Sequence, residues 1–153
     1  MGGDIVPYFR RAFHRPRRMF FPIPAQTFPM LYLLLFLSGG ALYVVLELFW
    51  RGHSHVSMAL AGGTCLVLLY GVFTYFPALP LFVRALMGAA VITAVEYVTG
   101  AVVNVRLRLH VWDYSALPYN CYGQICLRYS LLWLLLSVPA AVAVDLIARL
   151  IKA

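Results

Sequence analysis

The sequence predicts an all-α, polytopic membrane protein that folds as a bundle of four transmembrane helices. Of its 153 residues, 63% are hydrophobic and only 11% are charged, whereas soluble domains have about 45–50% and about 25%. The apolar residues form four long runs, and a bilayer core about 30 Å thick needs about 20 apolar residues for each spanning helix. We therefore expect four spans and no separate soluble domain.

The first 28 residues predict a basic segment at the membrane surface, ahead of a transmembrane domain over residues 29–153. Five arginines lie in this segment, interleaved with phenylalanines: Arg10, Arg11, Arg15, Arg17 and Arg18. The pattern is typical of an amphipathic segment in the cytoplasmic headgroup region, where arginines contact anionic lipid. We therefore expect membrane lipid as a partner and no binding of nucleic acid.

The four spans are expected at residues 29–50, 56–76, 81–107 and 124–150. Pro77 and Pro80 separate the second span from the third, because proline ends one helix and suits the first turn of the next. Small residues recur at helical spacing within the spans, and in lipid they allow helix backbones to approach closely. These features predict a compact bundle.

The distribution of lysine and arginine predicts the orientation. With four spans, both termini and the 76–80 turn share one side, while RGHSH (51–55) and residues 108–124 share the other. The first side carries the N-terminal arginines with Arg84, Arg149 and Lys152, and the second carries Arg51, Arg106, Arg108 and Arg128. Because the more basic side faces the cytoplasm, we expect a multi-pass protein of the inner (plasma) membrane with cytoplasmic N- and C-termini. Both polar connections would then lie on the outer face.

Two glutamates inside the predicted spans are the first candidates for function. A carboxylate at Glu47 or Glu96 costs at least about 2.5 kcal/mol within a span, so each is expected to face a partner or a water-filled cavity. Arg128, one turn into the fourth span, is the expected cation for either. Gly100 and Asn104 follow Glu96 at helical spacing, which predicts a polar seam facing inward. The glutamates could form a structural tie to arginine, a path for protons, ions or substrate, or a protonated acid held by hydrogen bonds.

The polar connections also contain residue types that bind zinc, namely His53, His55, His110 and Asp113. Their spacing matches no strong metal motif, and histidines at a membrane interface commonly bond to carbonyls or carboxylates. We therefore treat a metal site as the weaker interpretation and name no cofactor. Cys121 and Cys126 could pair if the outer compartment is oxidising.

The stretch between the third and fourth spans predicts a folded cap. Asp113 can accept a local hydrogen bond from Ser115, and Asn120 with Gly123 can turn the chain before Gln124 begins the fourth helix. We expect this cap to meet RGHSH over the buried glutamates and to enclose a polar pocket. The candidate residues of that pocket are Glu47, Arg51, His53, His55, Glu96, Asn104, Arg106, Trp112, Asp113, Tyr114, Asn120, Gln124 and Arg128.

Several blocks of the sequence resemble a known family. They are GHSHVSMALAGG (52–63), EYVTG (96–100), WDYS (112–115), PYN (118–120) and GQICL (123–127). Together they resemble the CmpB-like family of type IV ABC-transporter permeases over roughly residues 43 to 137, and they are similar to a group of small four-span eukaryotic transmembrane proteins. The resemblance implies a four-span bundle with these motifs at its centre and a transport role. The chain has no G-x-x-x-x-G-K-[ST] phosphate loop, so we do not expect it to hydrolyse ATP itself.

Three functions are compatible with these observations. The first is a transport-associated protein, like an ABC-transporter permease, with a polar pocket at the outer face. The second is a membrane-embedded enzyme acting on a lipid or isoprenoid, with His53 or His55 as base. The third is a structural subunit that binds a partner membrane subunit or a second copy of the chain. The sequence favours the first and disfavours catalysis.

Overall fold

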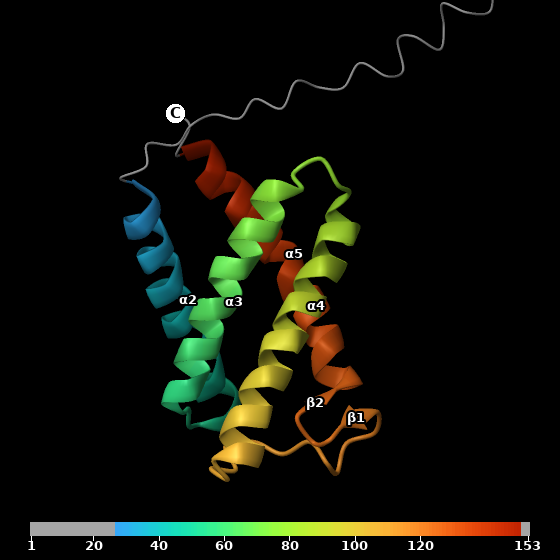
Figure 1. Cartoon of the computed structure of the whole chain (residues 1–153). Coiled ribbons are helices and arrows are strands. Elements are labelled where there is room, and N and C mark those ends of the chain that lie inside the picture. The colour runs from blue at the N-terminus through green and yellow to red at the C-terminus, as the bar shows by residue number, and fades with distance from the viewer. Residues whose placement is uncertain (1–26, 151–153) are drawn as a thin grey trace, which may run out of the picture.

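A computed structural model describes residues 27–150, so residues 1–26 of the amphipathic segment expected over residues 1–28 lie outside the described residues. The described chain is a bundle of four helices, each long and apolar enough to cross a membrane, so the predicted fold class is confirmed. The helices are α2 (Thr27–Arg51), α3 (Val56–Tyr75), α4 (Leu81–Gly100) and α5 (Leu127–Leu150). Helices that follow each other in the sequence run antiparallel (Figure 1).

Helices α2 and α3 pack through glycine, as the small-residue pattern predicts. A Cβ atom added at Gly40 would lie 2.7 Å from the carbonyl oxygen of Ala59, and one at Gly63 would lie 2.6 Å from that of Phe36. Only glycine allows backbones to approach this closely. The outer surfaces of the helices carry exposed leucines, phenylalanines and valines, as expected for a face that meets lipid.

A partly buried ion pair joins α4 to α5 in the half of the bundle away from the long loop. The guanidinium of Arg84 is 4% exposed, and its two terminal nitrogens each donate a 2.8 Å hydrogen bond to a different oxygen of Asp145. The same guanidinium lies 5.2 Å from the centre of the Phe73 ring on α3. This arrangement ties three helices together, and the sequence had not indicated the Arg84–Asp145 pair.

Two local features correct the predicted spans. The third span ends in a π-helical segment, η1 (Ala101–Arg106), instead of continuing as a regular α-helix. The fourth helix begins at Leu127 instead of 124, because a small antiparallel ribbon occupies the preceding residues. The ribbon pairs β1 (Asn120–Cys121) with β2 (Ile125–Cys126), and Gly123, at a φ of 69°, lies in the turn between them.

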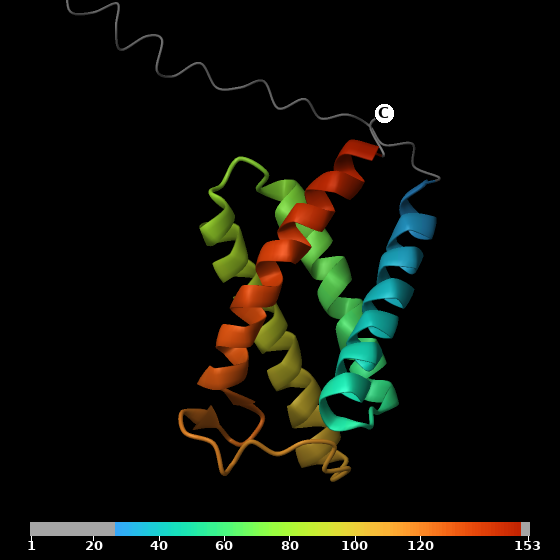
Figure 2. The ribbon, with the colours of Figure 1, turned by 180° about the vertical axis from the view of Figure 1, so that it is seen from behind.

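Both polar connections lie at one end of the bundle, called here the loop end, as predicted (Figure 1). This end holds the turn between α2 and α3 and the loop over residues 107–126. Helix α5 runs obliquely across the bundle, and in Figure 2 it diverges from α2 toward the loop end. The space between these two helices at the loop end is where the candidate site lies.

Candidate binding pocket at the loop end

The two polar connections contact each other through Arg51, the last residue of α2. Its guanidinium donates a 3.3 Å hydrogen bond to the carbonyl oxygen of Val111 in the long loop. The same group forms an ion pair with Glu47, one helical turn earlier. Glu47 is 9% exposed, and its second oxygen accepts a 2.6 Å hydrogen bond from the hydroxyl of Ser54. The cation that neutralises Glu47 is therefore Arg51.

Glu96 is the more unusual carboxylate, because neutral groups hold it. It is 6% exposed, and its two oxygens accept a 3.0 Å hydrogen bond from the hydroxyl of Tyr114 and a 2.8 Å hydrogen bond from the indole of Trp133. The expectation that Arg128 pairs with either glutamate is wrong. Helix α5 begins only at Leu127, and Arg128 in its first turn is exposed and makes no ion pair with either residue.

Tyr114 connects the loop to this carboxylate. Its ring stacks on that of Tyr129, with 4.6 Å between the ring centres. Burial and the neighbouring Glu96 carboxylate raise the pKa of the Tyr114 hydroxyl, which therefore stays protonated and donates its hydrogen. Glu96 is thus bonded to the loop through Tyr114 and to α5 through Trp133.

A second set of hydrogen bonds joins the loop to the end of the third span. Asn104 donates a 3.0 Å hydrogen bond to the side-chain oxygen of Gln124 and accepts a 2.7 Å hydrogen bond from the backbone of Val111. The indole of Trp112 donates to the carbonyl oxygen of Gln124 at 2.9 Å. Gly100 makes room for this contact, since a Cβ there would lie 2.5 Å from the Gln124 side-chain oxygen. The π-helical segment carries Asn104 and turns it into the bundle.

The exposed part of the loop folds through the local bonds that the sequence predicts. Asp113 accepts hydrogen bonds from the backbone and the hydroxyl of Ser115, at 2.8 Å and 3.0 Å, and these bonds lower the pKa of Asp113. Asn120 donates to the carbonyl oxygen of Leu117 at 2.7 Å and accepts from the backbone of Gly123 at 3.1 Å. Asp113 and Asn120 therefore build the cap and are not among the residues that line the pocket below it.

The remaining candidates lie outside the pocket. His55 caps α3 by accepting a 3.2 Å hydrogen bond from the backbone of Ser57, and His53 is exposed beside the carbonyl oxygen of Arg51. Arg106 is exposed as well. Within residues 27–150, no three histidine, cysteine, aspartate or glutamate side chains are placed to hold a metal ion.

The cysteines of the ribbon are both free. Cys121 pairs with Ile125, and Cys126 pairs with Asn120, so the two side chains point to opposite faces of the ribbon. Cys121 is exposed, whereas Cys126 is 2% exposed. This arrangement leaves Cys121 as an accessible thiol on the loop.

The glutamates share a cavity of about 230 Å³ between α2 and α5. Among the sequence candidates, it brings together Glu47, Arg51, Glu96, Trp112 and Tyr114. Sequence reasoning missed its other lining residues, which come from α2, α3 and α5: Tyr43, Leu46, Trp50, Met58, Tyr129, Leu132, Trp133 and Leu136. The spacing of Tyr129 and Trp133, one helical turn apart, is the signal that could have identified them. We call this cavity the loop-end pocket.

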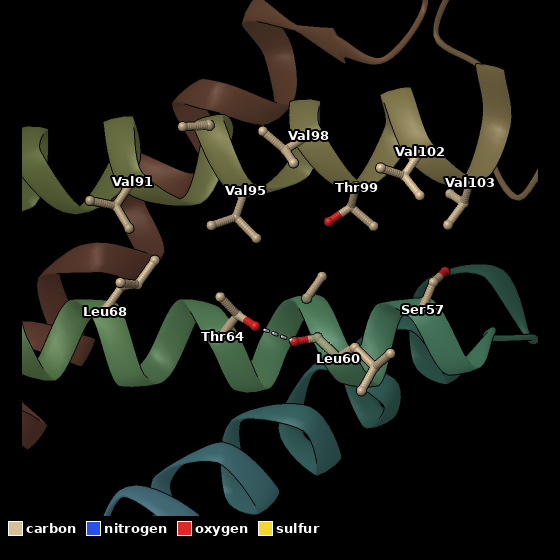
Figure 3. A pocket seen from close by; sticks show the side chains of 12 residues that line it. Ser57, Leu60, Thr64, Leu68, Val91, Val95, Val98, Thr99, Val102 and Val103 are labelled. Carbon is tan, nitrogen blue, oxygen red and sulfur yellow. Dashed lines mark hydrogen bonds between the residues drawn. The ribbon is translucent and has the colours of Figure 1, made fainter. Parts of the chain in front are cut away.

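A larger groove of about 570 Å³ lies between α3 and α4 (Figure 3). Its lining is aliphatic apart from the hydroxyls of Ser57, Thr64 and Thr99. Thr64 already donates a 2.8 Å hydrogen bond to the carbonyl oxygen of Leu60 in its own helix. None of the described residues that line this groove is charged, whereas the loop-end pocket has two carboxylates and a guanidinium in its lining.

Comparison with known proteins confirms the resemblance seen in the sequence blocks. Residues 34–152 match a family model described as "Putative ABC-transporter type IV". The match covers well over half of the chain and includes all four helices, although α2 only in part. Comparisons with curated proteins and with solved structures gave no match.

Proposed function

The chain belongs to this family of ABC-transporter-type membrane proteins, and on that premise we propose that it is a transport-associated subunit that binds a small molecule in the loop-end pocket. The observation that carries the proposal is the carboxylate of Glu96. It lines the pocket, is 6% exposed and has no cation paired with it among the described residues. An ionisable side chain held this way inside a span marks a binding or conduction site.

A purely structural role explains Glu96 less well. Its hydrogen bonds to Tyr114 and Trp133 join the loop to α5, but a glutamine could also bond to both, accepting from the Trp133 indole and donating to the Tyr114 hydroxyl, without the cost of a buried charge. A charge kept beside an open cavity is explained when a ligand makes use of it. The pocket also has a mixed lining of aromatic, aliphatic and a few polar groups, which is typical of small-molecule sites.

The proposal extends to orientation. We infer that the loop end faces the outer side of the inner (plasma) membrane and that both termini lie in the cytoplasm. The distribution of arginine supports this orientation, since the N-terminal sequence alone carries five arginines within residues 10–18. A molecule from outside the cell would then reach the pocket without first crossing the bilayer.

We further propose that the chain works with membrane lipid and with a partner membrane subunit or a second copy of itself. Because the sequence lacks a phosphate loop, any energy from ATP would come from a separate subunit. The exposed apolar surfaces of α2 and α5 are available for such contacts.

Replacing Glu96 with glutamine tests the proposed function. Cells lacking their own copy would be supplied with the wild type, Glu96→Gln or Tyr119→Phe, and their small-molecule content would be compared by mass spectrometry. Tyr119 is a suitable control because it is 82% exposed on the same loop and does not line the pocket. We expect Glu96→Gln to resemble cells without the chain and Tyr119→Phe to resemble the wild type.

The comparison requires that both variants reach the membrane in normal amounts and unfold near the wild-type temperature. If Glu96→Gln meets these conditions and the small-molecule content still equals that of wild-type cells, the pocket does not serve transport.

A further inference from the structure

We infer that the loop-end pocket takes an organic ammonium ion, meaning a positively charged nitrogen that bears alkyl groups. The nitrogen could belong to a free molecule or to a lipid headgroup, since the pocket would recognise the same chemistry in both. This inference rests on the proposed function, because it names the class of molecule that the same pocket binds.

The charges of the pocket favour a cation. Two carboxylates, Glu47 and Glu96, and one guanidinium line it. The guanidinium of Arg51 is already paired with Glu47, whereas Glu96 receives only neutral hydrogen bonds. Glu96 therefore has no cationic partner among residues 27–150, and its ionised form would repel an anionic ligand while attracting a cationic one.

The aromatic lining selects for an alkylated cation over a metal ion. The pocket is lined by two aromatic pairs: Tyr43 contacts Trp133 with 6.0 Å between the ring centres, and Tyr114 stacks on Tyr129 with 4.6 Å between them. Aromatic faces attract cations, and cages of such rings are used to bind quaternary ammonium groups. Metal ions instead need several oxygen or nitrogen ligands, and the described part of the chain offers no cluster of three.

The size and surroundings of the pocket suit a small ammonium group with a hydrocarbon part. At about 30 Å³ for each water-sized group, a cavity of about 230 Å³ holds roughly seven to eight such groups. Leu46 on α2 and Leu132 and Leu136 on α5 are among the lining residues, and Leu46 is 43% exposed. An alkyl chain could leave the pocket along these leucines toward the membrane.

Choline is the probe that tests this inference. The chain has three tryptophans, and all of them line the pocket, so their fluorescence reports binding directly. Purified full-length protein in a maltoside detergent would be titrated with choline and with its neutral isostere, in which a tert-butyl group replaces the trimethylammonium group. We expect choline to bind about tenfold more tightly or better, from the cation–π attraction combined with the charge of Glu96.

Two variants locate the effect. Glu96→Gln should remove most of the difference between choline and the isostere, because it removes the unpaired charge. Tyr114→Leu should weaken the binding of choline. Tyr119→Leu, its matched control on the exposed face of the loop, should leave that binding unchanged. Equal binding of the two ligands to the wild type, or an unchanged preference for choline in a folded Glu96→Gln protein, would overturn the inference.

The same titration in nanodiscs distinguishes the two sources of the ammonium group. If a lipid headgroup occupies the pocket, choline should bind more weakly in phosphatidylcholine than in phosphatidylglycerol nanodiscs. Equal affinities would identify a free molecule. If choline fails to bind but Glu96→Gln still alters the small-molecule content of cells, the ammonium class is wrong and the transport function stands. If Glu96→Gln alters choline binding but leaves the small-molecule content of cells unchanged, the ammonium class stands and the transport function is wrong.

Discussion

The indole nitrogen of Trp133 lies 2.8 Å from a carboxylate oxygen of Glu96, and this hydrogen bond joins α5 to α4 across 37 residues of sequence. Trp133 is 8% exposed, so both partners are removed from solvent. Each of them would lose a hydrogen bond without gaining one from water if the other were changed. The bond therefore has a structural effect that can be measured separately from ligand binding.

Trp133→Phe should destabilise the protein by about 1–3 kcal/mol, because it leaves one buried oxygen of Glu96 without a donor. Thermal unfolding in detergent measures the change. Trp50→Phe is the matched control, since Trp50 lines the same pocket but is 66% exposed. Similar losses for the two variants would show that the hydrogen bond to Glu96 contributes little.

Asp145→Asn should destabilise the bundle by up to about 3 kcal/mol, because it leaves the Arg84 charge buried without its counterion. The lower end of the usual range is expected, as the Asp145 side chain is 37% exposed and admits water. The double variant Arg84→Met/Asp145→Leu should recover most of the loss. Unfolding in a denaturing detergent series measures both, and a double variant no more stable than the single one would contradict the argument.

Gly100→Ala should destabilise the loop end by about 1–3 kcal/mol through overpacking. The new methyl group would lie 2.5 Å from the Gln124 side-chain oxygen and 3.0 Å from the Trp112 ring, so the hydrogen bond from Asn104 to Gln124 should weaken. Gly71→Ala on α3 is the control, because nothing lies within 4 Å of its added Cβ. That change should stabilise its helix by up to about 1 kcal/mol, and tryptophan fluorescence should shift only in Gly100→Ala.

Cys121 should react with a membrane-impermeant maleimide in intact cells if the loop end faces outward. It is a free and exposed thiol, whereas Cys65 and Cys126 are buried. Labelling should be lost in Cys121→Ser and should not increase when the cells are opened. Labelling that appears only after lysis would place the loop end in the cytoplasm and reverse the proposed orientation.

The helices and the local folding of the loop were predictable because they depend on short-range patterns. The apolar runs predicted the four spans to within a few residues. The pairing of Asp113 with Ser115 predicted the local hydrogen bond that the structure contains. The partner of Glu96 was not predictable from such patterns. Which side chain faces it depends on where α5 begins, and the ribbon delays that start to Leu127, so Trp133 faces the carboxylate and Arg128 does not.

The Arg84–Asp145 pair was not predicted from the sequence for a related reason. Its members are 61 residues apart and lie near the start of one span and the end of another, where charged residues are common and usually face headgroups. Only the packing of α3, α4 and α5 brings the guanidinium inward over the Phe73 ring.

The π-helical turn at Ala101–Arg106 constrains the length of the third span. Each residue of a regular helix advances the chain by about 100° around the axis. Deleting one residue there would let the segment form a regular α-helix. The loop that carries Trp112 and Tyr114 would then start in a different direction. A bilayer would tolerate a span shorter by 1.5 Å, but the loop would no longer arrive above the glutamate. The number of residues between Gly100 and the loop is therefore set by the pocket and not by the thickness of the membrane.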